Sequence, residues 1–151
     1  MSTLLLRLAA PLQSWGINSK FEYRFTEKMP TKSAVVGMLA AALGLGRDAD
    51  LSKLNALKFG VRADREGEEI TDFHMAHERD FWKKHDAKYT HLTYRHYLSD
   101  AVFLAGFEGD DTFLREIEYA IKNPKYPLFL GRRSCPPTLP IVIKISSSQL
   151  E

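Results

Sequence analysis

The chain has 151 residues, 44% of them hydrophobic and 26% charged, and its formal net charge at pH 7 is +2. That length suits one domain with a single hydrophobic core and is short for two. No apolar run reaches the roughly 18 residues that a membrane-spanning helix needs, and the apolar start lacks the basic leader of a secretory signal. The single cysteine excludes an internal disulfide and fits a reducing compartment. We therefore expect a cytoplasmic globular protein that does not enter a membrane.

Charged residues are unevenly distributed along the chain. Residues 119–150 contain five basic residues and no acid, and residues 1–60 contain eight basic residues and four acids. Such segregation lets a nearly neutral protein present one basic face, which is typical of nucleic-acid-binding proteins. A solvated surface on which charges cluster by chance explains the pattern equally well.

Two elements are predicted in the first third of the chain. The apolar run at 3–10 predicts a buried strand, which Pro11 ends. After a long polar connection, good helix formers at 34–43 predict a helix that is apolar nearly all round, with Ser33 as its N-cap and Gly44 at its end. The pattern G-x-G-x-x-A that begins at Gly44 follows this helix instead of opening it, so it does not predict a dinucleotide cofactor.

The remaining elements complete an alternating order. We predict a short helix at 51–57 and strands at 58–64, 97–107, 128–130 and 139–145. Within 110–126 we predict an amphipathic helix that Asp110 or Asp111 caps and Pro124 ends. The order is β, α, β, an irregular insertion, β, α, β. It predicts an α+β fold of the ferredoxin-like βαββαβ type, in which helices cover one face of an antiparallel sheet. We expect residues 1–151 to form this single domain.

The insertion, at 70–97, has an unusual composition. It contains five Lys or Arg residues, six aromatic residues and all the histidines of the chain, namely His74, His77, His85, His91 and His96. Because it has few aliphatic residues with which to build a core, we expect it to project from the sheet and to be ordered by a partner. The histidines do not predict zinc, because there is no second cysteine and no H-E-x-x-H or C-x-x-C pair.

Two functions remain open for this insertion. Lys84, His85 and Tyr89 are the residue types that RNA cleavage without metal needs, a base for the ribose 2′-OH and an acid for the leaving 5′-oxygen. The same composition suits binding alone, with imidazoles and aromatic rings stacked on bases and lysines on phosphates. The sequence favours binding.

The start of the first helix is a candidate anion site. Lys28, Lys32 and Ser33 stand where free backbone N–H groups and the helix dipole favour negative charge. Simple capping explains the same residues, and both can hold at once.

A second candidate site is the turn that contains adjacent arginines. Arg132 and Arg133 follow Gly131 between two apolar runs, and guanidinium forks suit bidentate contact with phosphate or guanine. Gly131 lets another backbone approach closely. The alternative is an ion pair between the arginines and the acidic helix at 110–118. We predict that Cys135, beside this turn, is a packed thiol.

Three segments resemble one family when they are taken in order: LRLAAPLQSWG near the start, PTKSAVVGMLAAALGLGRD in the first helix and YPLFLGRRSCPPTLP near the end. They are similar to the Cas-five family of the RAMP superfamily of CRISPR-associated proteins, in its type I-E Cascade form. The stretch DFH…TYRHYLSDAVF also resembles the borders of that family's protruding thumb. Members of the family usually continue well past the strand after the arginine turn, so we expect the C-terminal part of the family to be absent here.

The resemblance implies an RRM-like, ferredoxin-like core with a β-hairpin thumb at about 70–97. It implies a subunit that grips the repeat-derived 5′ handle of CRISPR RNA and caps the backbone filament of Cascade. Its partners would be the backbone and large subunits, and it would meet target DNA only through the complex. Carried over by position, the handle contacts are Arg24, Lys28, Lys32, Ser33, Gly131, Arg132, Arg133 and Ser134. The thumb residues are Trp82, Lys83, Lys84, His85, Lys88 and Arg95.

The resemblance also bears on catalysis. In the type I-C branch the corresponding subunit is a metal-independent endoribonuclease that processes precursor CRISPR RNA, whereas in type I-E a separate subunit cuts. The segment LGRRSCP resembles the type I-E branch. We therefore predict a non-catalytic subunit without metal or cofactor, and Lys84, His85 and Tyr89 would be the catalytic residues of the alternative.

Overall fold

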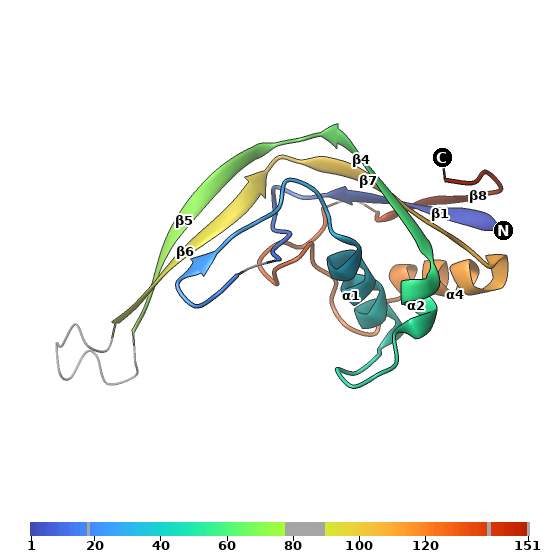
Figure 1. The fold of residues 1–151 in the computed structure, drawn as a ribbon, viewed down its shortest axis with the longest axis horizontal. Helices are drawn as coiled ribbons and strands as arrows, with labels where there is room; N and C mark the ends of the chain where they lie inside the picture. Colours follow the sequence, from blue (N-terminus) through green and yellow to red (C-terminus); the bar gives the residue numbers. More distant parts are fainter. Residues whose placement is uncertain (18, 78–89, 139, 151) are drawn as a thin grey trace.

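Helices lie on one side of an antiparallel sheet, and a long hairpin extends away from it (Figure 1). The computed structural model describes residues 1–17, 19–77, 90–138 and 140–150. The sheet has the order β4-β7-β1-β8, and its strands are β1 (Ser2–Ala9), β4 (Lys58–Arg65), β7 (Val102–Gly109) and β8 (Val142–Ser146). The helices are α1 (Lys32–Leu43), α2 (Ser52–Ala56) and α4 (Asp111–Lys122).

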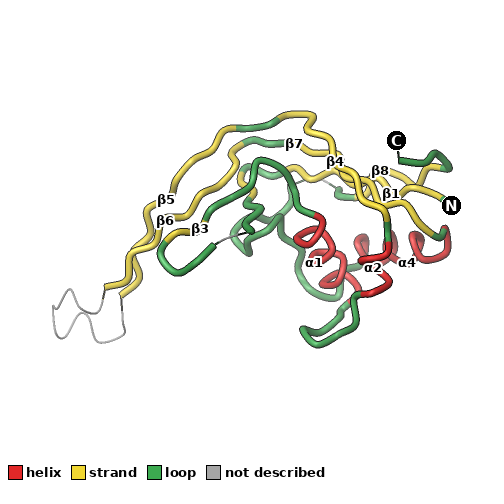
Figure 2. The backbone as a smooth tube through the Cα atoms, viewed as in Figure 1, coloured by secondary structure: helices red, strands yellow, loops and turns green. Residues whose placement is uncertain are grey.

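A second sheet forms the hairpin (Figure 2). Its long strands β5 (Glu68–His77) and β6 (Thr90–Ser99) pair antiparallel along their whole length. On the other edge of β6 lie two short strands, β2 (Leu12–Gln13), which is antiparallel to it, and β3 (Tyr23–Arg24), which is parallel. The prediction of an irregular insertion is therefore wrong for its described part, because these residues form a ladder of backbone hydrogen bonds that needs no aliphatic core of its own.

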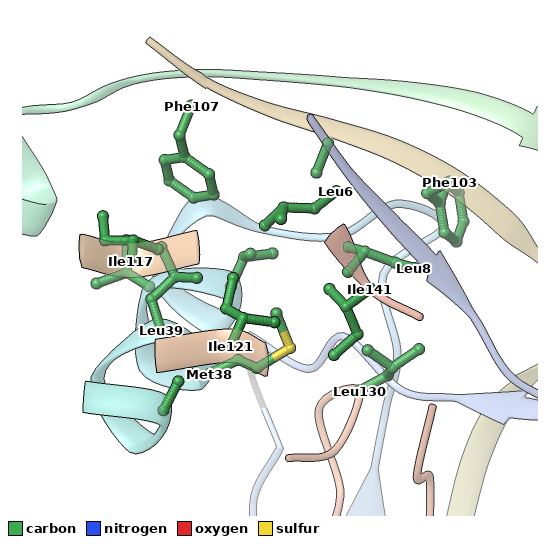
Figure 3. Close-up of a cluster of buried hydrophobic side chains, with 14 of the residues drawn as sticks. Leu6, Leu8, Met38, Leu39, Phe103, Phe107, Ile117, Ile121, Leu130 and Ile141 are labelled. Atoms are coloured by element: carbon green, nitrogen blue, oxygen red, sulfur yellow. The ribbon is translucent and has the colours of Figure 1, made fainter. Parts of the chain in front are cut away.

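The hydrophobic core lies between the sheet and the helices (Figure 3). The side chains of Leu6 and Leu8 on β1 and of Phe103 and Phe107 on β7 are fully buried on the helix side of the sheet. They meet helical side chains that include Met38, Leu39, Ile117 and Ile121. Burying a side chain of this size stabilises the fold by roughly 1.5–3 kcal/mol, so this layer accounts for the helix positions. The predicted mixture of helices and antiparallel strands is confirmed.

The ends of the helices follow their local sequence. Thr31, not Ser33, is the N-cap of α1, because Thr31 has an extended backbone and its Oγ1 accepts from the Ala34 N–H at 3.3 Å, whereas Ser33 already lies inside the helix. Gly44 ends α1 in the left-handed conformation, as predicted. Asp110 caps α4 by accepting from the N–H of Phe113. Among the helices formed by described residues, none is both long and apolar enough to cross a membrane.

Two strand predictions need correction. The strand predicted at 97–107 is two strands, because Asp100 has a φ of 57° and separates the end of β6 from the start of β7. No strand forms at 128–130. Leu130 is instead a fully buried side chain at the start of a tight turn, so its apolar character reflects burial in the core and not a sheet ladder.

The last described residues are pinned across the outer face of the sheet, opposite the helices. The Thr3 hydroxyl donates to the Ser148 carbonyl at 2.7 Å, and the Lys58 ammonium donates to the Leu150 carbonyl at 2.6 Å. The Leu150 N–H donates to the Glu108 carboxylate at 2.7 Å. That hydrogen bond, with help from nearby Lys58, lowers the pKa of the Glu108 carboxyl below its ordinary value.

Glu108→Gln is expected to make the melting temperature less dependent on pH in the acidic range. Because the pKa is lowered in the folded state, ionised Glu108 stabilises the fold fully above the ordinary pKa of glutamate, about 4.3, and this contribution is lost as the pH falls through the folded-state pKa. Melting temperatures measured from pH 7 to pH 3 should therefore fall less steeply for Glu108→Gln than for the parent chain. Glu116→Gln, at an exposed position of α4, is the control. Equal slopes for Glu108→Gln and the parent would contradict the assignment.

Candidate nucleic-acid interface

A row of stacked rings runs along one face of the hairpin. The parallel pairing of β3 with β6 places the Tyr23 ring 5.1 Å from the Tyr94 ring, and the Phe25 ring lies 5.1 Å from the His96 ring. Phe73, opposite Tyr94 on β5, adds a tilted ring at 5.4 Å. Tyr23, Phe25 and Phe73 are each about half exposed, at 49%, 48% and 51%. We call these five side chains the aromatic row. Half-exposed aromatic rings are the residue type on which proteins stack nucleic-acid bases.

The sequence prediction misses two of the five members of this row. Phe73, Tyr94 and His96 lie in the insertion, whose aromatic and histidine content is unusual, but Tyr23 and Phe25 lie in the long connection that is predicted to be polar. The signal was the strict alternation of Phe21, Tyr23 and Phe25 with polar residues, which is the period of a strand with one apolar face. The strand is only two residues long, so its pattern is easily overlooked.

The same pairing brings together two predicted site residues, the handle contact Arg24 and the thumb residue Arg95. They lie opposite each other in the β3–β6 register, one residue along from Tyr23 and Tyr94. Because side chains alternate between the faces of a sheet, these arginines lie on the opposite face from the aromatic row. The Arg95 Nε donates to the Thr93 hydroxyl at 3.3 Å.

The arginine turn, residues 130–135, is a rigid structure. Its ends are tied by the Leu130 N–H, which donates to the Cys135 carbonyl at 2.7 Å, and both end residues are buried. Burial also raises the pKa of the Cys135 thiol, so the predicted packed thiol is confirmed. Gly131 has a φ of +90°, and a Cβ built on it would lie 1.6 Å from the carbonyl oxygen of Ser14. The close approach that Gly131 permits is thus to the protein's own backbone.

Arg132 fastens this turn to the base of the hairpin. Its guanidinium donates to the carbonyls of His96 at 3.0 Å, Arg24 at 2.6 Å and Phe25 at 3.5 Å. The same group lies over the Tyr97 ring, 4.8 Å from its centroid, which adds a cation–π contact. The alternative of an ion pair with residues 110–118 is therefore wrong for Arg132. Its fork is bound to the protein backbone at the place where β3 leaves β6.

Arg133 and Ser134 occupy the outer part of the turn. Arg133 is exposed, and within the described chain its guanidinium has neither a hydrogen bond nor an ion pair. The Ser134 hydroxyl lies 3.4 Å from the Tyr97 hydroxyl. Arg133 is therefore the arginine of the turn that is available to a ligand, and Arg132 is the one that holds the turn in place.

Of the residues predicted to bind an anion at the start of α1, Lys32 is instead bound to the protein. The Lys32 ammonium donates to the carbonyls of Asn55 and Leu57, both at 2.7 Å, so it caps the end of α2 instead of pointing at a ligand. Ser33 is exposed in the first turn of α1. Lys28 lines a cavity.

That cavity, of about 460 Å³, lies between the segment before α1 and the turn from β4 to β5. Its lining includes Lys28, Met29, Ala63, Glu66, Glu69 and Leu98. The Glu69 carboxylate lies 2.8 Å from Nδ1 of His96, the histidine of the aromatic row. The cavity therefore adjoins the end of the row and has both a lysine and carboxylates in its walls.

The remaining predicted residues lie outside the described residues. These are Trp82, Lys83, Lys84, His85, Lys88 and Tyr89, which include the whole catalytic set of the alternative function. Of the histidines, His74 contacts the Thr93 hydroxyl through Nδ1 at 3.2 Å. Within the described ranges, no three His, Cys, Asp or Glu side chains are placed to hold a metal ion.

Known proteins are similar to almost all of this chain. Residues 3–149 match the model of a family described as CRISPR-associated protein (Cas_Cas5). The CRISPR system Cascade subunit CasD of Escherichia coli (strain K12) is 35% identical in an alignment that is 158 positions long. This alignment covers 94% of this chain and 70% of CasD.

Two solved structures are similar in fold. A chain described as a Cas protein crystal structure has 46% identity and a TM-score of 0.74, and a chain of a CRISPR RNA-guided surveillance complex has 37% identity and a TM-score of 0.84. Each match covers 93% of the present chain. The chain spans 62% and 61% of those two solved chains.

Proposed function

This chain belongs to the CRISPR-associated protein family (Cas_Cas5), and from that premise we propose that it is a non-catalytic RNA-binding subunit of a type I-E-like Cascade complex. It grips the repeat-derived 5′ handle of CRISPR RNA and caps the backbone filament. Its protein partners are the backbone and large subunits, and it meets target DNA only through the complex. The similarity to a protein named as a Cascade subunit and to a chain of an RNA-guided surveillance complex supports this assignment.

The described topology supports a ferredoxin-like core with a thumb. The order β4-β7-β1-β8, with α1 between β1 and β4 and α4 between β7 and β8, is the arrangement expected of a βαββαβ unit. The β5–β6 hairpin joins β4 to β7 and extends from the core, which is the place where the family resemblance puts the thumb.

One observation carries the RNA-binding proposal. Arg132 ties the arginine turn to the backbone of Phe25 and His96, two members of the aromatic row. The Arg133 guanidinium, which has no partner among the described residues, and the half-exposed rings are therefore joined to one backbone framework. A cation for phosphates together with rings for bases is the combination that binds single-stranded RNA.

Handle-dependent binding is the expected result of a gel-shift series in EDTA. The RNAs are a CRISPR RNA with its 5′ handle, the same RNA without it, and the intact repeat, each with a denaturing lane beside the native one. We expect the handle-bearing RNA to shift and to stay intact, and the affinity to fall steeply with salt because phosphate contacts release counterions. A discrete cut within the repeat would instead support the endoribonuclease alternative. A complex that assembles equally well after nuclease treatment would support a purely structural adaptor.

A further inference from the structure

We propose that the cavity beside the aromatic row is a pocket for one extruded guanine base of the bound RNA, with Glu69 and Lys28 as the groups that read its Watson–Crick edge. The inference rests on the proposed RNA-binding function and adds the identity of a base to it. The cavity volume of about 460 Å³ is within the range of small-molecule pockets.

The walls of the cavity combine apolar contact with a few polar groups. Met29, which is 39% exposed, offers apolar surface to the face of a planar ring, and the buried Leu98 closes the wall of the cavity behind it. Lys28 is exposed, and no described residue pairs with its ammonium. An apolar slot with a small number of convergent polar groups is the usual form of a site that orients a small ring system.

Glu69 is held in position before any ligand arrives. Its Oε1 lies 2.8 Å from Nδ1 of His96, and the Thr71 hydroxyl lies 3.2 Å from the same nitrogen. The His96 ring is in turn stacked on Phe25 at 5.1 Å. Because the register pairs Glu69 with Leu98 and Thr71 with His96, these side chains share one face of the hairpin. A carboxylate that is already oriented loses little entropy on binding.

The charges of the cavity match guanine better than the other bases. A carboxylate only accepts hydrogen bonds and an ammonium only donates them. The Watson–Crick edge of guanine presents two neighbouring donors, N1–H and N2–H, and one acceptor, O6. Glu69 can accept from both donors while Lys28 donates to O6. Adenine and cytosine each offer one exocyclic amine beside a ring acceptor, which a carboxylate repels, and uracil offers a single donor between two carbonyls.

The pocket also has a path to the rest of the RNA. His96 contacts Glu69 on one side and stacks on Phe25 on the other. Bases that stack along the aromatic row therefore lead to the cavity, and single-stranded RNA is commonly read by one splayed base next to stacked ones.

The test is fluorescence anisotropy with the full chain and labelled RNA octamers at fixed salt. The set is an oligouridine octamer and octamers that carry one guanine at each position in turn; at the best position, guanine is then replaced by inosine, which lacks the N2 amine, and by adenine. We expect the best guanine octamer to bind about tenfold or more tightly than oligouridine, inosine to lose part of that gain and adenine to lose all of it. Glu69→Gln should abolish the preference, so that the best guanine octamer binds no more tightly to the variant than oligouridine does. Glu66→Gln removes the other carboxylate that lines the same cavity, whereas the carboxylate held by His96 is that of Glu69, so this variant should keep the preference.

The outcomes distinguish a failure of the guanine pocket from a failure of the proposed RNA-binding function. If every octamer binds with the same affinity, the guanine pocket is wrong and the RNA-binding function stands. A preference that Glu66→Gln removes and Glu69→Gln preserves would also overturn the assignment. If no octamer binds and handle-bearing CRISPR RNA does not bind either, the proposed function itself fails. The inosine and adenine comparisons need no protein variant, so they stay informative even if Glu69→Gln folds poorly.

Discussion

Gly131→Ala is expected to lower the free energy of unfolding by about 3 kcal/mol, from a strained φ and from overpacking. The backbone of Gly131 has a φ of +90°, which side chains other than glycine rarely adopt, and the added methyl carbon would lie 1.6 Å from the Ser14 carbonyl oxygen. That oxygen belongs to the backbone, so it cannot rotate away. The arginine turn must move as a unit, and the buried Leu130 must move with it.

Gly46→Ala is the matched control for this prediction. Gly46 lies in the loop after α1, has no strained φ, and has open space where the methyl group would be. Thermal and urea unfolding followed by circular dichroism should show a large loss for Gly131→Ala and almost none for Gly46→Ala. Equal stabilities of the two variants would mean that the turn does not dock against Ser14 as described.

Replacing Arg132 or Arg133 by alanine is expected to affect two different properties, the stability of the fold for Arg132 and RNA binding for Arg133. Arg132→Ala should destabilise the fold by about 2 kcal/mol, since its hydrogen bonds to the His96, Arg24 and Phe25 carbonyls come from a charged group. Arg133→Ala should leave the melting temperature unchanged. It should weaken binding of handle-bearing RNA about tenfold and make the salt dependence shallower by about one phosphate contact.

Arginine-to-lysine variants, and a control at an arginine far from the turn, test the two roles further. Arg132→Lys should recover little stability, because one ammonium cannot reach the carbonyls that a planar fork spans. Arg133→Lys should recover much of the RNA affinity, because a single phosphate needs only a positive charge. Arg47→Ala, at an exposed position in the loop after α1, removes the same charge and should change neither property. If Arg133→Ala lowers stability and leaves RNA binding intact, the assignment of the two roles is reversed.

Local sequence rules predicted the helices and most of the core strands. The Gly44 C-cap, the Asp110 cap of α4 and the apolar run of β1 were each visible in a window of a few residues. The same rules failed where the determining contact is distant in sequence. Leu130 looked like part of a strand because burial under a turn and burial in a sheet both select leucine.

The site was harder to predict for the same physical reason. Tyr23 becomes part of a platform only because it pairs with Tyr94, 71 positions away, and no periodic pattern specifies a two-residue parallel pairing. Arg132 was predicted as an RNA contact from its residue type, its place in the turn and the family resemblance. Its actual partners are backbone carbonyls, which carry no sequence signal, so its role in holding the turn could not be read from the chain. The residues predicted at the hairpin tip remain predictions.

The residue-by-residue pairing of β5 with β6 restricts how the length of the hairpin can change during evolution or engineering. Each arm pairs from Glu68↔Ser99 to His77↔Thr90 without a bulge, so a residue added to one arm must be matched by one added to the other. A matched pair inserted between the aromatic row and the core would turn Phe73 and Tyr94 to the other face of the sheet, and the pairing of Tyr23 with Tyr94 would be lost. Lengthening by two residues in each arm restores the face. Homologous hairpins that keep the row should therefore differ in arm length by even numbers between the row and the core.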